Sequence, residues 1–201
     1  MCGRYYVDDN TAGEIEKLVG QMDENRRQKS LQAAGRIVAG DIHPGNDAPV
    51  LSGQGSSICC QWQHWGFPGF QGKSLIFNAR CESALEKPLF RESILHRRIV
   101  VPAAWFYEWN SKKEKNTFRR RDTPLLFMAG FSKRYEDGEH FVILTTAANA
   151  SMEPVHDRMP LILERREITE WVLDDTKMEK ILHKSPCLLE RETDYEQMSL
   201  W

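Results

Sequence analysis

The second residue of the chain, Cys2, offers a chemistry that no internal residue can supply. Removal of Met1, which is usual before a small side chain, would leave Cys2 with a free α-amine beside its thiol. The amine has a pKa of about 8 and the thiol one of about 8.5, so both hold a reactive fraction at neutral pH. Such an aminothiol captures an aldehyde as an imine and then closes a thiazolidine ring through sulfur. The alternative is an ordinary cysteine on a frayed terminus.

Two further segments place polar groups next to predicted strands. Phe77-Asn78-Ala79-Arg80 ends a strand, where an amide and a cation can meet a phosphate or sugar. A strand-end turn with a surface arginine is the alternative. In Phe106-Tyr107-Glu108-Trp109, aromatic neighbours would raise the pKa of the carboxyl group and suit it to proton transfer. Alternation puts Glu108 on the face opposite Tyr107 and Trp109, and an outward glutamate on a half-buried strand is the alternative.

A histidine and a cluster of aromatic residues complete the candidate chemistry. His156-Asp157-Arg158-Met159-Pro160 places an imidazole beside an acid and a base, in a loop between two apolar strands, which makes it a catalytic candidate. A structural or solvated histidine is the alternative. The segment Trp62-Gln63-His64-Trp65-Gly66-Phe67-Pro68 offers aromatic faces on which unstacked bases could sit, although such residues also fill cores.

The composition limits the class of protein. A chain of 201 residues with 41% apolar residues suits one domain with a real core, spanning residues 1–201. No apolar run approaches the roughly 20 residues of a membrane span, and no signal sequence opens the chain, so we expect a cytoplasmic protein. Five cysteines without a CxxC pair argue against a disulfide framework or a zinc site.

The charge is unevenly distributed along the chain. The net charge is −2, but residues 71–134 hold fourteen Lys/Arg against six Asp/Glu. This basic middle segment predicts a groove for an anionic ligand. For residues 112–115, solvated charges in a turn are the favoured interpretation.

The elements that must position these residues are mostly short strands. Thr11 and Glu14 form a capping box that predicts an early helix, and residues 23–36 read as loop or frayed helix. Helical patterns follow at 82–97 around Pro88, at 167–173 and at 176–182, the last with Thr176 and Glu179 as a capping box. Strands are predicted at 48–51, 58–65, 75–79, 99–101, 105–109, 125–131, 141–146 and 161–163. We therefore expect an α+β domain with a mainly antiparallel, barrel-like β core and peripheral helices.

The order of these motifs resembles one known family. Met1-Cys2-Gly3-Arg4, Trp65-Gly66-Phe67-Pro68, Asn78-Ala79-Arg80, Phe106-Tyr107-Glu108-Trp109 and His156-Asp157-Arg158-Met159-Pro160 are similar to motifs of the SOS response-associated peptidase (SRAP) family. That family includes the eukaryotic embryonic-stem-cell-specific hydroxymethylcytosine-binding protein. The resemblance runs from Met1 to the final Met198-Ser199-Leu200-Trp201.

The resemblance implies an activity and a role for each motif. Family members recognise abasic sites in single-stranded DNA and trap them as a covalent DNA–protein crosslink, without a metal or other cofactor. Cys2 would be the nucleophile after autocatalytic loss of Met1, Asn78 would position its amine and the sugar, and Glu108 would transfer protons. His156 would assist sugar ring opening and crosslink reversal. The implied DNA-binding residues are Arg4, Arg80, Trp65, Trp109 and Arg158. We expect a monomer, nucleoid-associated if the source is bacterial.

Some positions depart from the family pattern, and other functions compete. Trp105 stands where glycine is common, and we expect it to narrow the pocket or reshape its strand. Cys81 replaces a small residue and is expected to be an inert core cysteine, with a secondary thiol as the alternative. One competing function is a cysteine peptidase acting on other proteins through Cys2, His156 and Glu108. Another is a non-catalytic binder of single-stranded or modified DNA.

Overall fold

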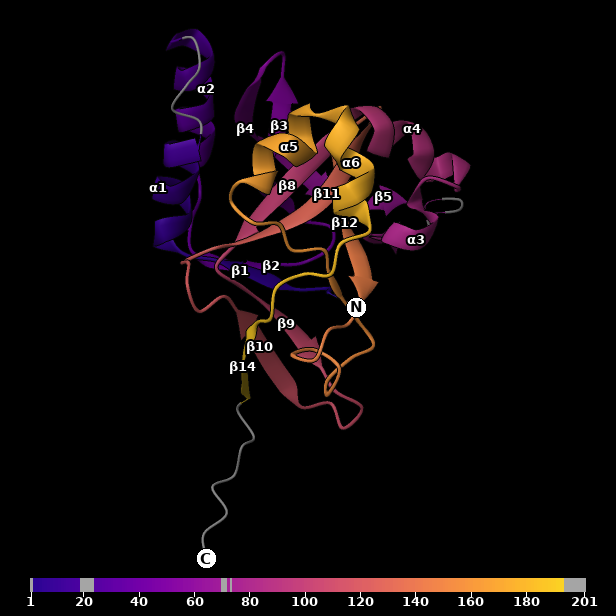
Figure 1. The fold of residues 1–201 in the computed structure, drawn as a ribbon. Helices are drawn as coiled ribbons and strands as arrows, with labels where there is room; N and C mark the ends of the chain where they lie inside the picture. Colours follow the sequence, from indigo (N-terminus) through magenta and orange to yellow (C-terminus); the bar gives the residue numbers. More distant parts are fainter. Residues whose placement is uncertain (1, 19–23, 70–71, 73, 194–201) are drawn as a thin grey trace, which may run out of the picture.

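A closed ring of five strands forms the centre of the protein (Figure 1). The computed structural model describes residues 2–18, 24–69, 72 and 74–193. Neighbouring strands in the ring are antiparallel except for the parallel contact of β12 with β4, and the pairing of β11 with β12 closes it. In ring order the strands are β11 (Leu126–Tyr135), β8 (Arg98–Ala103), β3 (Asp47–Gln54), β4 (Ser57–Trp65) and β12 (Gly138–Ala147).

A second, antiparallel sheet extends from the ring and carries the N-terminal strand. Only Ala104 separates β8 from β9, so the two sheets share one continuous segment of chain. The order is β14 (Glu190–Thr193), β10 (Lys115–Arg119), β9 (Trp105–Trp109), β1 (Tyr5–Val7) and β2 (Gly40–Ile42).

Two short strands pair with β12 outside the closed ring. There β12 pairs in parallel with β7 (Asn78–Arg80) and antiparallel with β13 (Arg158–Pro160). A separate ribbon joins β5 (Phe67–Pro68) to β6 (Leu75–Ile76).

Helices lie around the outside of the ring (Figure 1). Helices α5 (Glu167–Leu173) and α6 (Asp175–Leu182) cover one side of it, and α1 (Asp9–Leu18) and α2 (Glu24–Ala34) stand at another. The short helices α3 (Cys81–Ala84) and α4 (Pro88–His96) follow β7, so the helical stretch predicted at 82–97 is divided into two helices, the second of which begins at Pro88. The fold is α+β with a barrel-like sheet and peripheral helices, as expected. Among the described residues no helix is long and apolar enough to cross a membrane.

Two helices begin at a different capping residue from the one predicted. At α1 the reciprocal pair is Asp8 and Thr11, because Asp8 Oδ1 accepts from Thr11 N at 3.0 Å and Thr11 Oγ1 accepts from Asp8 N at 3.0 Å. At α6 the carboxylate of Asp174 accepts from Thr176 N at 2.9 Å. Aspartate caps a helix at least as well as threonine, so both helices begin before the predicted threonine.

The inner strand predicted at 161–163 is wrong in its placement. Ile162 forms only an isolated bridge with Met128, and the strand that pairs with β12 lies earlier, at β13. The predicted strand 75–79 is divided at Phe77 into β6 and β7, which pair with different partners.

The buried side chains form two cores. One, which we call the Cys2 core, packs Cys2 and β1 against the inner faces of β9, β10, β4 and β12. The other, the helix-side core, holds Cys81, Phe90 and Trp171 beneath the helices. Large members of the Cys2 core include Tyr5, Trp65, Phe106, Phe118, Phe141, Met152, Val155 and Met159.

Candidate active site around Cys2

Cys2 lies just before β1 in the Cys2 core, and we call its immediate surroundings, with Asn78 and Glu108, the Cys2 pocket. Its side chain is 1% exposed, and its Sγ lies 4.0 Å from the carbonyl oxygen of Arg4. Burial, followed by the negative charge of Glu108, raises the pKa of the Cys2 thiol to about 12. The thiol therefore keeps its proton at neutral pH. Its reaction requires a group that removes this proton or stabilises the negative charge on the sulfur.

Asn78 contacts Cys2 directly, as the first residue of β7. Its Nδ2 donates a hydrogen bond to the Cys2 carbonyl oxygen at 2.9 Å. The parallel pairing of Asn78 with Ile143 on β12 fixes the position of the amide. Asn78 Oδ1 is buried and has no hydrogen-bond partner among the described residues, so an acceptor remains beside the main chain of Cys2.

Glu108 is buried on the same side of its strand as the Cys2 core. It is 6% exposed, and its neighbour on that face, Phe106, is fully buried. The hydrogen bond from Tyr107 N to Arg4 O, 3.0 Å long, extends the β1–β9 ladder toward Cys2. Of the two alternatives that the sequence left open, the burial of Glu108 supports the inward one.

His156 lies in the loop that joins β12 to β13. Met152 and Val155 of that loop belong to the Cys2 core, so the loop is packed against it. His156 Nδ1 accepts a hydrogen bond from Arg158 N at 2.9 Å and lies 2.8 Å from Asp157 Oδ1. The first contact suits a neutral ring with its proton on Nε2, and the second suits a proton on Nδ1. The ring thus has a partner in both protonation states.

Arg4 faces away from the pocket, on the outer side of the second sheet. Its guanidinium forms an ion pair with Asp41, and this hydrogen bond lowers the pKa of the carboxyl group despite partial burial. The guanidinium carbon also lies 5.0 Å from the ring centre of Tyr107. Trp109, 37% exposed, lies 6.4 Å from the same ring. Asp41 had no distinguishing signal in the sequence.

Two residues expected to contact DNA have structural surroundings instead. Trp65 is fully buried, its indole 5.1 Å from Tyr5, with Nε1 donating to Phe77 O at 3.0 Å. It has no exposed face on which a base could stack, and we assign it to the pocket wall. Arg158 forms two hydrogen bonds of 2.8 Å with Glu82 and one of 2.6 Å with Thr145 O. Its guanidinium therefore joins β13 to β12 and α3.

The two departures from the family pattern lie outside the pocket. Trp105 stacks on Tyr6, with ring centres 4.3 Å apart and planes at 3°, and packs against the helix-side core. Since Glu108 points to the other face of the strand, the expected narrowing of the pocket by Trp105 is wrong. Cys81 is 2% exposed in the helix-side core, as an inert core cysteine should be.

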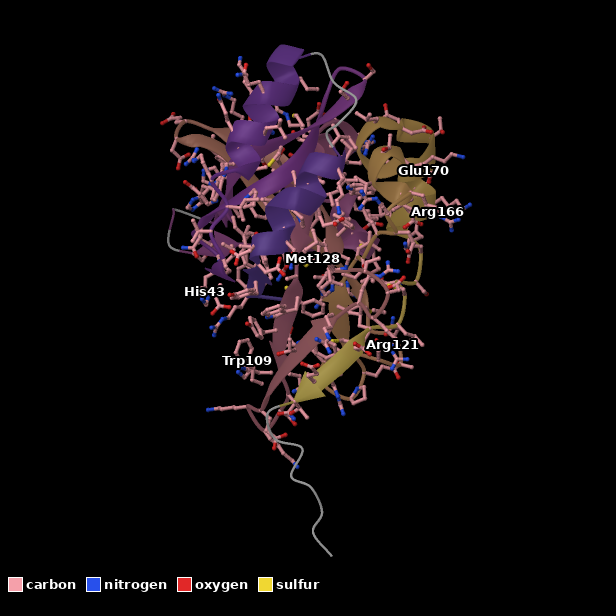
Figure 2. All side chains as sticks on the ribbon, turned by 90° about the vertical axis from the view of Figure 1, so that its left-hand side faces the viewer. His43, Trp109, Arg121, Met128, Arg166 and Glu170 are labelled. Atoms are coloured by element: carbon pink, nitrogen blue, oxygen red, sulfur yellow. The ribbon has the colours of Figure 1, made fainter. Side chains whose placement is uncertain are left out.

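Much of the basic segment is neutralised within the protein. Arg98 is buried and pairs with Asp175, while Arg119 and Arg121 both contact Glu190. Figure 2 shows Trp109 and Arg121 on opposite sides of the lower sheet. Among the described residues of this segment, Arg119, Arg120 and Arg121 line a pocket together with the acidic Asp8, Asp122 and Glu190. Arg80 is exposed at the end of β7, two residues after Asn78. Among the described residues no group of three or more His, Cys, Asp or Glu could hold a metal ion.

Comparison with solved structures supports the fold. A Bacteroides thetaiotaomicron protein superimposes with a TM-score of 0.78 at 21% identity, covering 96% of this chain and 91% of that one. A phage-related protein from Bordetella bronchiseptica gives a TM-score of 0.75 at 22% identity, covering 97% and 95% of the two chains.

Comparison of sequences gives the family. The abasic site processing protein YedK of Escherichia coli is 28% identical over 180 residues, which are 86% of this chain and 79% of that protein. The abasic site processing protein YoqW of Bacillus subtilis is 31% identical over 192 residues, 86% of this chain and 80% of that protein. The SOS response associated peptidase (SRAP) family matches residues 1–200, and the chain belongs to this family.

Proposed function

We propose that this protein processes abasic sites by capturing them covalently, in single-stranded DNA, through Cys2. The observation that carries the proposal is the meeting of Cys2, Asn78 and Glu108 in the Cys2 pocket, from three separate segments. The names of the relatives, abasic site processing proteins, agree with this substrate.

The chemistry begins once Met1 has been removed by the protein itself. The α-amine of Cys2 attacks the aldehyde of the opened abasic sugar, water leaves, and an imine forms. Glu108 carries the protons between amine and oxygen. The thiol then adds to the imine carbon: the carbon–sulfur bond forms, the π pair moves to nitrogen, and nitrogen takes the thiol proton. The resulting thiazolidine cannot promote β-elimination, so the strand stays intact.

Other residues support the same reaction. The hydrogen bond from Asn78 fixes the main chain of Cys2, which keeps amine and thiol on one reacting carbon. His156, with a partner at Nδ1 in either protonation state, protonates the sugar ring oxygen during opening and reversal. Exposed Arg80 contacts the phosphate backbone of the DNA. Arg4 makes the same kind of contact once its ion pair with Asp41 has opened. The exposed ring of Trp109 stacks on a base. We propose that residues 1–201 act as one monomeric domain without a cofactor.

Mass spectrometry and a denaturing gel test the proposal together. Protein whose mass shows Cys2 at the N-terminus is incubated with single-stranded DNA that carries one abasic site. We expect a heat-stable shifted band without any reductant. A Cys2→Ser protein should give a band only after borohydride reduction of its imine. Equal crosslinking by wild type and Cys2→Ala would refute the assignment.

The competing functions give different results in the same samples. The contact between His156 and Asp157 resembles the base and its orienting acid in a peptidase, which predicts repeated cleavage of an added peptide. A non-catalytic binder predicts salt-sensitive retention of DNA that survives loss of Cys2 and leaves no covalent product.

A further inference from the structure

The hydroxyl group of Tyr5 is a polar group in the Cys2 core that the proposed mechanism leaves unused. Tyr5 is fully buried, and its ring lies 5.1 Å from Trp65. Its hydroxyl oxygen is buried and makes no hydrogen bond to any described residue. Native cores retain few such groups, because an unsatisfied hydroxyl destabilises the folded state. Phenylalanine would fill the same space without this loss of stability, so the hydroxyl oxygen of Tyr5 needs an explanation other than packing.

Strand geometry places the side chain of Tyr5 on the face of the sheet that carries Glu108. Tyr5 pairs in register with Phe106 on β9, so its side chain shares a face with Phe106 and Glu108. Burial, and then the charge of a Cys2 thiolate, raise the pKa of Tyr5 well above its ordinary value. The phenol is therefore within electrostatic reach of the sulfur, and a hydrogen-bond donor there would stabilise negative charge on it.

The other polar groups of the pocket are committed to other contacts or carry the wrong charge. Asn78 Nδ2 already donates to the Cys2 carbonyl, and the nearby Arg4 guanidinium points out of the pocket to Asp41. Glu108 can accept the thiol proton, but its own negative charge opposes a thiolate. A neutral donor such as a phenol stabilises the sulfur without drawing Glu108 into an ion pair that would end its role as base.

We propose that the Tyr5 hydroxyl donates a hydrogen bond to Cys2 Sγ while the sulfur adds to the imine. The inference rests on the proposed function and assigns a further residue to its second step. In that step the thiol proton passes through Glu108 to the imine nitrogen as the carbon–sulfur bond forms. Tyr5 keeps its own proton throughout, so no additional reactant is needed.

Tyr135 provides a matched control. Its hydroxyl is likewise buried and without a partner among the described residues, but the side chain packs against the helix-side core. Its ring lies 5.7 Å from Phe67 and 4.9 Å from His140. Tyr5→Phe and Tyr135→Phe each remove one unsatisfied oxygen, so both should melt at or above the wild-type temperature.

Two measurements on processed protein separate the two variants. The first is alkylation of Cys2 by iodoacetamide between pH 7 and pH 10, followed by peptide mass spectrometry. The second is the rate at which the adduct with abasic single-stranded DNA becomes resistant to borohydride trapping. Loss of one hydrogen bond to sulfur should slow both about tenfold in Tyr5→Phe, with a higher apparent pKa of Cys2. Tyr135→Phe and the rate of imine formation should not change.

Identical alkylation profiles for Tyr5→Phe and wild type would overturn the inference. So would a lower melting temperature for Tyr5→Phe than for Tyr135→Phe, because it would mean that the hydroxyl serves the fold. If wild type forms no crosslink at all, the proposed function fails, while the alkylation profiles still decide whether Tyr5 acts on the sulfur.

Discussion

Cys2 and Cys81 lie at the two ends of β7 in very different surroundings. Asn78, at one end of the strand, bonds to Cys2, and Cys81 follows Arg80 at the other end. Both thiols are buried, and burial raises the pKa of each to about 12. By depth and acidity alone the two cysteines are equivalent.

Their neighbours distinguish them. The Cys2 pocket contains an amide at its carbonyl, a buried carboxylate and a phenol. Cys81 packs in the apolar helix-side core, and the adjacent Glu82 is bound by Arg158. The proton acceptors and donors around Cys2 therefore distinguish it from Cys81 as the candidate nucleophile. Burial by itself does not, because it only suppresses the thiolate.

The largest expected effect comes from removing each sulfur in turn. Cys2→Ala should reduce crosslinking to abasic single-stranded DNA by at least about 1000-fold, since the thiol and its role in ring closure are lost. Cys81→Ala should crosslink within about twofold of wild type and lose about 1 kcal/mol of stability through a small cavity. Denaturing gels and urea unfolding measure the two quantities. Crosslinking that depends on Cys81 would remove the distinction between the regions.

Replacing Glu108 should change two properties of Cys2 in opposite directions. The charge of Glu108 raises the pKa of the thiol, so Glu108→Gln should lower that pKa and speed alkylation of Cys2 at neutral pH. The same variant should crosslink about 100-fold to 10,000-fold more slowly, because a general acid–base group is lost. Rates from iodoacetamide labelling and from gels test both directions. Parallel changes in the two rates would mean that Glu108 acts only through the charge on sulfur.

The sequence predicted the fold class and some of the strands, but not how the strands pair around the candidate site. Strand alternation placed Glu108 on the face opposite Tyr107 and Trp109 without deciding which face is buried, and the span of β9 was predicted in full. Strands β1, β2, β10 and β14 were missed because they are short or carry several polar and charged residues; β1, β2 and β14 also pair with segments distant in the sequence, whereas β10 forms a local hairpin with β9. Hydrophobic periodicity indicates which residues share one side of a strand, but it does not indicate with which other strands that strand pairs.

The same limit explains the residues whose surroundings were misjudged. Arg158 and Trp65 were expected to contact DNA because their side chains are of types that bind it. The sequence does not show that Arg158 pairs with Glu82 or that Trp65 packs on Tyr5. Trp105 was expected to narrow the pocket or reshape its strand because it stands where glycine is common. It precedes Glu108 by three residues, an odd spacing that puts the two on opposite faces. No pattern in the sequence distinguishes Tyr5. Its hydroxyl is recognised as unusual only once the structure shows that it is buried without a hydrogen-bond partner among the described residues.

A smaller effect is expected at Arg80, the exposed residue between Asn78 and Cys81. Arg80→Ala should weaken binding of single-stranded DNA several-fold and reduce the salt dependence of log K by about 0.7, the value for one phosphate contact. The control is Arg91→Ala on α4, which removes the same charge from another exposed position. Fluorescence anisotropy at several salt concentrations measures both. Equal slopes in the two variants would show that Arg80 does not contact the phosphate backbone.

The smallest effect belongs to the Glu82–Arg158 pair beside Cys81. The hydrogen bond from Arg158 lowers the pKa of Glu82 below its usual value of 4.5, against a partial desolvation effect. The pair therefore stabilises the fold above about pH 4.5, and this contribution is lost as the pH falls through the lowered pKa. Because Glu82 is about half exposed, Glu82→Gln should cost less than about 1 kcal/mol at pH 7.

Thermal melts of wild type and Glu82→Gln between pH 7 and pH 3 should accordingly converge at the acid end. A constant gap would mean that the ion pair is not the source of the difference. Crosslinking at pH 7 provides the second readout, because β7 links this pair to Asn78. An unchanged crosslinking rate in Glu82→Gln would mean that the residues around Cys81 contribute only to the stability of the fold. A slower rate would show that Arg158 positions Asn78 through β12 and β7, and that the two ends of the strand act together.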